Sequence, residues 1–134
     1  MEKKIFTLDE ANELLPYVKE ELSFLKKSKK EFQQKYQELQ EFLHQNRYHE
    51  HSQSYRDYVF EAECSLEFIE LEFKMHLNSV QSKGIQIKEI DYGLVDFPAV
   101  IDGEEVLLCW REGEEAVSYY HGLYDGFAGR KSLD

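Results

Sequence analysis

Apolar residues recur at alternating steps of three and four along the first part of the chain, in two series separated by a polar loop. The first series, interrupted once at Lys29, consists of Leu15, Val18, Leu22, Leu25, Phe32, Tyr36, Leu39 and Leu43. The second series consists of Tyr55, Val59, Ala62, Leu66, Ile69, Phe73, His76 and Val80. Such spacing keeps one face of an α-helix apolar, as in coiled coils. Because two such helices joined by a short loop pack side by side, the sequence predicts a long antiparallel helical hairpin over residues 6–83.

Thr7 and Glu10 indicate where the first helix begins. A threonine followed three residues later by a glutamate forms a capping box, in which each side chain accepts a hydrogen bond from the backbone N–H of the other residue. Phe6 and Ala11 flank this box and are placed to form a hydrophobic staple. The sequence therefore predicts a capped helix start at Thr7.

Three features predict the interruptions and ends of the helices. Pro16 removes a backbone donor and crowds the preceding turn, so we expect a kink there, with a separate short helix over residues 8–15 as the alternative. The polar residues 46–54 predict the loop between the helices. Gly84 predicts the end of the second helix, because glycine is common just past a helix end.

The second helix carries a further apolar stripe on another side, made of Cys64, Phe68, Leu71 and Met75. A helix that is apolar on two sides needs two covering surfaces. The first helix supplies one of them, and either the C-terminal segment or a second copy of the chain supplies the other. We therefore expect a homo-oligomer, with a dimer favoured, or a protein partner bound through the helices.

The remaining residues alternate between strand-like runs and turn signals. The dipeptide Asp102-Gly103 separates the apolar run 94–101 from a returning run at 105–111. Asp-Gly between two such runs is a strong hairpin signal, because both residues tolerate the positive φ angles of a type I′ turn. The sequence therefore predicts a β-hairpin centred on this dipeptide.

Two further runs, residues 85–90 and 116–121, predict short strands on either side of this hairpin. Pro98 cannot donate to a strand ladder, so it predicts an edge position or a bulge. Strands that follow helices define an α+β fold. We expect a single domain over residues 1–134, in which the long antiparallel helical hairpin is followed by a small antiparallel β-meander over residues 84–134.

The charge balance and the lack of long apolar runs limit the classes of partner. The chain has 16 basic and 27 acidic residues, a net charge of −11, which repels a phosphate backbone, so we expect no nucleic-acid binding. No run of about 18 apolar residues occurs and the N-terminus lacks a signal-peptide core, so we expect neither membrane insertion nor secretion. The two cysteines, Cys64 and Cys109, predict no disulfide framework, which fits a reducing cytoplasm.

Several short motifs of the C-terminal part occur together: Gly93–Pro98 (GLVDFP), Leu108–Arg111 (LCWR), Gly113-Glu114, Tyr120-His121 and Gly126–Arg130 (GFAGR). With the opening Phe6–Leu8 and Leu14–Pro16, they closely resemble an uncharacterised bacterial family, domain of unknown function 2203. The resemblance covers nearly the whole chain and implies a bacterial, intracellular protein, but it implies no catalytic role. This chain has Tyr120-His121 where the family often has a Trp-His pair, a difference that keeps the imidazole.

Five polar residues near predicted strand ends and turns are the candidates for a functional cluster: Asp96, Arg111, Glu114, His121 and Arg130. A rigid sheet presents such side chains together. Asp96, Glu114 and His121 form a set able to ligate a divalent metal or to carry acid–base chemistry, and either arginine is able to contact an anionic substrate. A purely structural interpretation stays open as well. In it Asp96 caps a turn and His121 donates to a backbone carbonyl, while Glu114 pairs with one of the two arginines.

No sequence motif for nucleophilic catalysis or for phosphate binding accompanies these residues. Two hypotheses follow. The first is a non-enzymatic interaction or scaffold module that self-associates through its helices. The second is a small metal-dependent or acid–base enzyme with a site around Asp96, Glu114 and His121 and a divalent metal as its cofactor.

Overall fold

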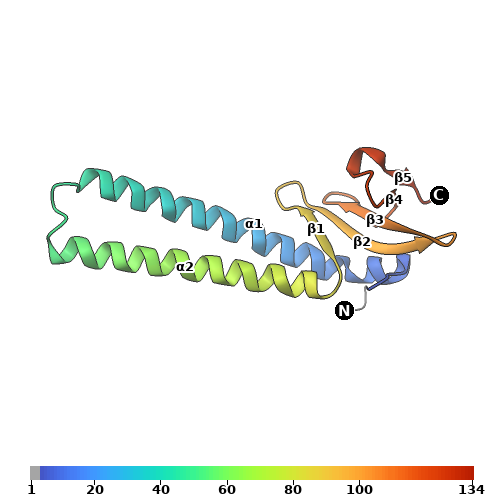
Figure 1. The fold of residues 1–134 in the computed structure, drawn as a ribbon, viewed down its shortest axis with the longest axis horizontal. Coiled ribbons are helices and arrows are strands. Elements are labelled where there is room, and N and C mark those ends of the chain that lie inside the picture. Colours follow the sequence, from blue (N-terminus) through green and yellow to red (C-terminus); the bar gives the residue numbers. More distant parts are fainter. Residues whose placement is uncertain (1–3) are drawn as a thin grey trace. The chain divides into compact units, whose positions relative to one another are not determined.

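Two helices are followed by five strands in the computed structural model, which describes residues 4–134 (Figure 1). The helices are α1 (Leu8–Gln45) and α2 (Gln53–Ser82), and a short 3₁₀-helix, η1 (Phe127–Gly129), lies near the C-terminus. The strands are β1 (Gln86–Glu89), β2 (Leu94–Ile101), β3 (Glu104–Arg111), β4 (Tyr119–Gly122) and β5 (Lys131–Ser132). The predicted α+β class, a helical hairpin followed by an antiparallel sheet, is confirmed.

Contacts divide the chain into two compact units. Unit 1 joins the chain up to Ser23 to Leu77–Asp134, so it contains the start of α1, the end of α2 and the whole sheet. Unit 2 is Phe24–His76 and contains the rest of both helices with the loop between them. The single domain expected from the sequence stays a prediction.

The start of α1 carries the predicted capping box. The backbone N–H of Thr7 donates to Glu10 Oε1 at 2.9 Å, and the backbone N–H of Glu10 donates to Thr7 Oγ1 at 3.1 Å. Phe6 and Ala11, the two residues of the predicted staple, are both buried in the core of unit 1. The box satisfies two backbone donors at the helix start, and the buried pair fixes the direction in which the chain enters the helix.

Glu10 is expected to stabilise the chain only where its carboxylate is ionised. The backbone N–H of Thr7, the Thr7 hydroxyl and the charge of Lys4 lower the pKa of Glu10 from its usual value of 4.5. A carboxyl whose pKa is depressed by folding stabilises above the unfolded pKa and loses that contribution as the pH falls through the folded pKa. The urea midpoint of Glu10→Gln should therefore lie below that of the wild type at pH 7, and the two midpoints should converge in acid. Midpoints that stay equally far apart below pH 4 would contradict this assignment.

α1 continues without a break through Pro16. The separate short helix over residues 8–15, one of the two outcomes predicted there, is therefore wrong, and the kink stays a prediction. Leu15 and Val18, on either side of the proline, are buried in the core of unit 1. This packing compensates for the backbone hydrogen bond that the proline removes.

α2 ends where the glycine signal predicts. Gly84 lies two residues beyond Ser82 with a φ of 93°, and its N–H donates to the Gln81 carbonyl at 2.9 Å. A Cβ atom at this position would lie 2.6 Å from the Cβ of Lys4. Both the left-handed backbone and the close approach of the N-terminal segment therefore require glycine.

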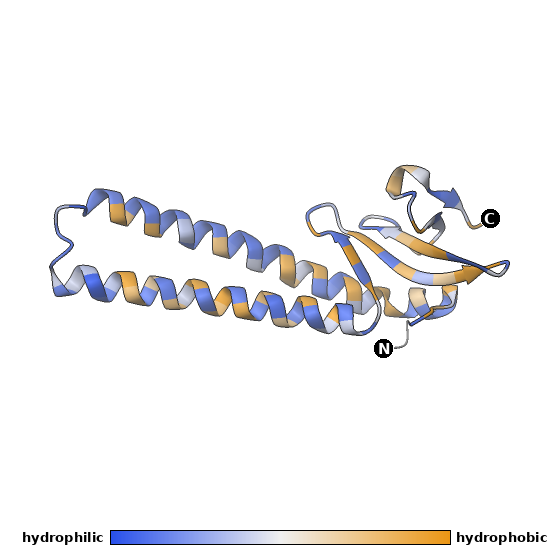
Figure 2. Ribbon diagram, in the orientation of Figure 1, coloured by the Kyte–Doolittle hydropathy of each residue, from blue (hydrophilic) through white to orange (hydrophobic). Residues whose placement is uncertain are grey.

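Part of the predicted seams is buried in unit 2, whereas Tyr36 of the first series is 51% exposed. Leu25 and Leu39 of α1 and Leu66 and Ile69 of α2 are buried. Figure 2 shows hydrophobic bands that recur along both helices. Within residues 4–134, no helix combines the length and the apolar character needed to cross a bilayer. The two helices of unit 2 are therefore held together by a narrow seam of buried side chains along their contact.

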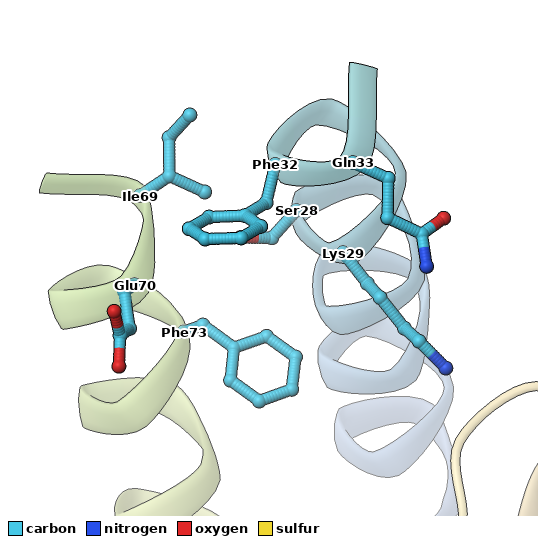
Figure 3. A pocket seen from close by; sticks show the side chains of 7 residues that line it. All are labelled: Ser28, Lys29, Phe32, Gln33, Ile69, Glu70 and Phe73. Atoms are coloured by element: carbon cyan, nitrogen blue, oxygen red, sulfur yellow. The ribbon is translucent and has the colours of Figure 1, made fainter. Parts of the chain in front are cut away.

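A pocket of about 400 Å³ lies between the helices of unit 2 where the first seam is interrupted (Figure 3). Its lining residues are Ser28, Lys29, Phe32, Gln33, Ile69, Glu70 and Phe73. The rings of Phe32 and Phe73 point from their helices into the space between them. Because Ser28 and Lys29 stand where the heptad pattern calls for a large apolar side chain, this space is not filled.

The five strands form one antiparallel sheet in the order β1-β2-β3-β4-β5, which confirms the predicted meander. Asp102 and Gly103 join β2 to β3 with φ angles of 51° and 81°, as a type I′ turn requires. This two-residue turn sets the register of the hairpin, in which Asp96 lies opposite Cys109. The observed bounds of β2 are those predicted from the sequence.

Pro98 lies at an open edge although β2 is an inner strand. β1 pairs with β2 only as far as Asp96, so the second half of β2 has a neighbouring strand on one side alone. The Pro98 carbonyl faces the open side, where it accepts a hydrogen bond from the N–H of Phe6 at 2.7 Å. Because the missing N–H of proline would point the same way, no ladder bond is lost. The predicted edge position is confirmed.

β4 is shorter than the predicted run 116–121 and begins only at Tyr119. The backbone N–H of Val117 donates to Oδ1 of Asn12 in α1 at 2.8 Å, so it is not available to a strand ladder. The side chain of Val117 is buried in the core of unit 1. This segment therefore ties the sheet to α1 before the strand begins.

One face of the sheet packs on the helical part of unit 1. The sheet contributes these buried residues: Val95, Phe97, Ala99, Val106, Leu108 and Trp110. Trp110 is the largest fully buried side chain, and its indole N–H donates to the Glu114 carbonyl at 3.0 Å. Because side chains alternate along a strand, the intervening residues of β2 and β3 lie on the opposite face.

Candidate functional site

Three polar side chains gather on the face of the sheet that is turned away from the core. Asp96 of β2 lies between two core residues and therefore projects to the opposite face. Its register partner in β3 is Cys109, and His121 of β4 pairs with Leu107 of β3, two residues away. Three neighbouring strands therefore bring Asp96, Cys109 and His121 together.

The hydrogen bonds of His121 fix the orientation of its ring. Nδ1 lies 2.8 Å from the Gly122 carbonyl oxygen, and Nε2 lies 3.1 Å from Asp96 Oδ2. A carbonyl only accepts, so Nδ1 carries a hydrogen, and in the neutral ring Nε2 is then an acceptor. The carboxylate of Asp96 is an acceptor as well. Contact between these two atoms therefore needs either a hydrogen on one of them or a metal ion between them.

All three side chains are buried: Asp96 is 2% exposed, Cys109 2% and His121 3%. Burial, and then the negative charge of Asp96, raise the pKa of the Cys109 thiol to about 12. The thiol is therefore protonated at neutral pH in the absence of a cation, and it is a poor nucleophile in that form. Thiol catalysis by Cys109 alone does not fit this environment.

The candidate ligand atoms of the three residues, one from each, all lie within 4.8 Å of one another. Among residues 4–134, this is the group of at least three histidine, cysteine or acidic side chains that lie close enough together to be candidate metal ligands. It combines one oxygen, one sulfur and one nitrogen, all of them buried.

A pocket of about 310 Å³ opens beside these three residues. Its other lining residues are mainly apolar and come from β1, β2, β3 and the segment after β4: Lys88, Leu94, Leu107, Leu123, Tyr124, Gly126 and Phe127. A pocket of this size is at the lower end of the range for small-molecule sites. The buried cluster therefore borders a space large enough for a small ligand.

Glu114 and Arg130 form a second polar group. Nη2 of Arg130 donates to both carboxylate oxygens of Glu114, at 2.8 and 2.7 Å, and the backbone N–H of Arg111 donates to Glu114 Oε1 at 2.7 Å. The carboxylate is thus already saturated by positive and polar partners. Among the described residues, Nε of Arg130 is a buried side-chain nitrogen without a hydrogen-bond partner.

The Glu114–Arg130 pair braces one wall of the pocket. The guanidinium of Arg130 lies over the rings of Tyr119 and Phe127, 4.0 and 4.6 Å from their centroids. Phe127 also lines the pocket. Because Arg130 is fixed by the carboxylate and by both rings, the pair holds η1 and its aromatic side chain beside the buried cluster.

The five residues predicted as one cluster therefore divide into two groups. Asp96 and His121 are hydrogen-bonded to each other, whereas Glu114 is bonded to Arg130 and to the backbone of Arg111. The guanidinium of Arg111 lies 5.7 Å from the centroid of the Phe127 ring. The residue that joins Asp96 and His121 is Cys109, which the sequence analysis left outside the cluster.

Cys109 had a readable signal in the sequence. In a hairpin with a two-residue turn at Asp102-Gly103, residues whose numbers add to the same total lie opposite each other, and this arithmetic pairs Asp96 with Cys109. Both then occupy the same face. The position of His121 depends on a longer, irregular connection and had no such signal.

The fold and site define a small α+β protein with a buried Asp-Cys-His cluster beside a pocket. The chain belongs to the family described as "Uncharacterized conserved protein (DUF2203)", whose model matches residues 4–133. No curated protein and no solved structure matches the chain.

Proposed function

We propose that this protein binds one divalent transition metal ion, with zinc the best fit, at Asp96, Cys109 and His121, and uses it for hydrolytic or acid–base chemistry in the adjoining pocket. The supporting observation is the convergence of an oxygen, a sulfur and a nitrogen ligand atom within 4.8 Å. Thiolate and imidazole suit zinc and related metals, whereas magnesium and calcium prefer oxygen ligands alone.

The distances favour a metal ion of this kind. Bonds of about 2.0–2.3 Å in a tetrahedron separate neighbouring ligand atoms by roughly 3.3–3.6 Å. The observed 3.1 Å between His121 Nε2 and Asp96 Oδ2 is close to that spacing. Sγ of Cys109 lies within 4.8 Å of both of these atoms. A change of the Cys109 side-chain rotamer would bring it closer to them.

The orientation of His121 supports the same proposal. Metal-bound histidines usually donate their second ring N–H to a carbonyl or a carboxylate, which directs the other nitrogen to the metal. The Nδ1–H to Gly122 bond does this for Nε2. Three protein ligands leave a fourth position for water or substrate, and zinc bound in this way lowers the pKa of its water. The Cys109 thiol would ionise on coordination, because the cation reverses the effect of burial.

This proposal revises one ligand of the metal site expected from the sequence. Glu114 is replaced by Cys109, because both oxygens of Glu114 are taken by Arg130. Glu114 and Arg130 then act as a brace for the pocket wall at Phe127. The self-association hypothesis concerns unit 2 and does not depend on this site.

Metal binding is tested with the full chain, stripped of metal by chelation and then titrated with Zn²⁺ by calorimetry. Wild type should bind one equivalent. Cys109→Ser should bind at least about tenfold more weakly, because it loses the soft ligand. With Co²⁺ as the probe, wild type should show a thiolate-to-metal absorption band that Cys109→Ser lacks.

The matched controls are Cys64→Ser, which removes the exposed thiol of unit 2, and Glu114→Gln. Both should bind Zn²⁺ as the wild type does, and far-UV circular dichroism of the metal-free variants establishes that each is folded. Absence of one-to-one binding by the wild type, or equal binding by Cys109→Ser, would rule the site out. If Glu114→Gln were the only variant with weakened Zn²⁺ binding, Glu114 and not Cys109 would be the third ligand.

A further inference from the structure

The side of α2 that faces away from α1 exposes a continuous apolar stripe within unit 2. The stripe consists of Phe60, Cys64, Phe68, Leu71 and Met75, spaced by four, four, three and four residues. The four large members are 57–69% exposed, and the thiol is exposed as well. In contrast, Leu66 and Ile69 of the same helix are buried in the seam with α1. Spacing of this kind places the stripe along one side of the helix, opposite the seam.

The stripe is large enough for a stable contact between two copies. If a fully exposed large side chain presents roughly 200 Å², the exposed fractions give roughly 500 Å² of apolar surface on one helix. Two such surfaces bury roughly 1,000 Å² before any flanking residue is counted, which reaches the lower limit for a specific interface. A patch of this size is at the upper end of what monomeric proteins expose, and such patches are often interaction sites.

The spacing of the stripe is nearly the same when read in reverse, which suits a two-fold axis. If two α2 helices pack antiparallel about a point beside Phe68, Phe60 of each copy lies opposite Met75 of the other, and Cys64 lies opposite Leu71. Phe68 then contacts the Phe68 of the second copy near the axis. Such reciprocal contacts are what an isologous dimer interface requires.

Acidic residues flank the stripe on both sides. Glu63, Glu67 and Glu70 lie on one side together with Lys74, whose Nζ is 2.8 Å from Oε1 of Glu70 in the same helix. Glu61 and Glu72 lie on the other side, and Asp57 precedes Phe60 by one turn. These like charges oppose the association of two copies, so salt should strengthen the dimer.

We infer that two copies of this chain associate through antiparallel contact of their α2 stripes, centred on Phe68. The dimer does not depend on the proposed metal site of unit 1, because all its contacts belong to unit 2. Unit 2 is then the region through which the chain dimerises.

Sedimentation equilibrium of the full chain tests the dimer. Wild type should self-associate reversibly, and Phe68→Glu should raise the dimer dissociation constant at least about tenfold, because it introduces two charges at the centre of the interface. Tyr36→Glu is the matched control, since Tyr36 is a 51% exposed aromatic of unit 2 on α1. It should associate as the wild type does.

Three outcomes would overturn the inference. The first is a wild type that stays monomeric at the highest concentration reached. The second is an equal loss of association in Phe68→Glu and Tyr36→Glu. The third is a dimer that salt weakens, as expected if the acidic flanks instead met a basic surface.

Cross-linking tests the direction of pairing. In the antiparallel dimer the two Cys64 residues are offset by about seven residues, roughly 10 Å along the axis, too far for a disulfide. Phe68→Cys in a Cys64→Ser background places a cysteine beside the axis and should form a disulfide-linked dimer on mild oxidation. Ready cross-linking of wild-type Cys64, with none through position 68, would show parallel pairing and overturn the antiparallel arrangement.

Discussion

Replacing Trp110 with alanine should lower the free energy of unfolding by about 3–5 kcal/mol. Trp110 is 0% exposed and is the largest fully buried side chain in unit 1. It is fixed by strand pairing with β2 and by the core below it, so little of the resulting cavity is able to collapse. Natural domains are stable by only about 5–15 kcal/mol. Urea unfolding followed by far-UV circular dichroism should therefore show a much lower midpoint for Trp110→Ala.

Trp110→Phe separates packing from hydrogen bonding. It keeps an aromatic ring in the core but removes the indole N–H that donates to the Glu114 carbonyl at 3.0 Å. Loss of that donor should cost about 1–3 kcal/mol, less than the cavity made by alanine. Equal losses in the two variants would show that the hydrogen bond, and not the filled volume, is the main contribution of Trp110.

The elements that were predictable from the sequence are those with local causes. The heptad spacing of the two seams depends on helix period alone, and the positive φ angles at Asp102 and Gly103 are a property of that dipeptide. The capping box of Thr7 and Glu10 spans only four residues. Each of these signals is contained in a short window of sequence, so each was readable without knowledge of the tertiary structure.

The errors arise where distant parts of the chain decide the local structure. The strand predicted from residue 116 begins at Tyr119, because the N–H of Val117 bonds to the side chain of Asn12, 105 residues away. At Pro16 the sequence left a kink and a separate short helix open, and the second is wrong because the neighbours of the proline are held in the core within one helix. Local propensity contains neither contact, so no window of sequence was able to reveal them.

The candidate site was only half predictable for the same reason. The hairpin register that joins Asp96 to Cys109 follows from the turn. The register of His121 is set by the irregular connection between β3 and β4, which is anchored by a bond to α1. The pairing of Glu114 with Arg130, one of the open structural alternatives, depends on the position of η1. Asp96 is hydrogen-bonded to His121 and Glu114 to Arg130, and a common function for all five polar residues stays a prediction.

Replacing His121 with leucine should cost about 3–5 kcal/mol of stability in the metal-free chain, because it leaves the carboxylate of Asp96 buried without its partner. The Asp96 and His121 side chains are 3% and 4% exposed, so water does not compensate. Urea unfolding in the presence of a chelator measures this loss. The same measurement on Asp96→Val gives the second single variant that a double-mutant cycle needs.

The double variant Asp96→Val with His121→Leu should recover most of that stability and lie within about 1 kcal/mol of the wild type, since a buried hydrogen-bonded polar pair is replaced by apolar groups of similar volume. It should also bind no Zn²⁺. That combination would mean that the chain keeps the pair for ligand binding and not for its contribution to folding. A double variant as unstable as His121→Leu would instead make the pair a structural element of the sheet, and the metal site at Asp96, Cys109 and His121 would lose its main support.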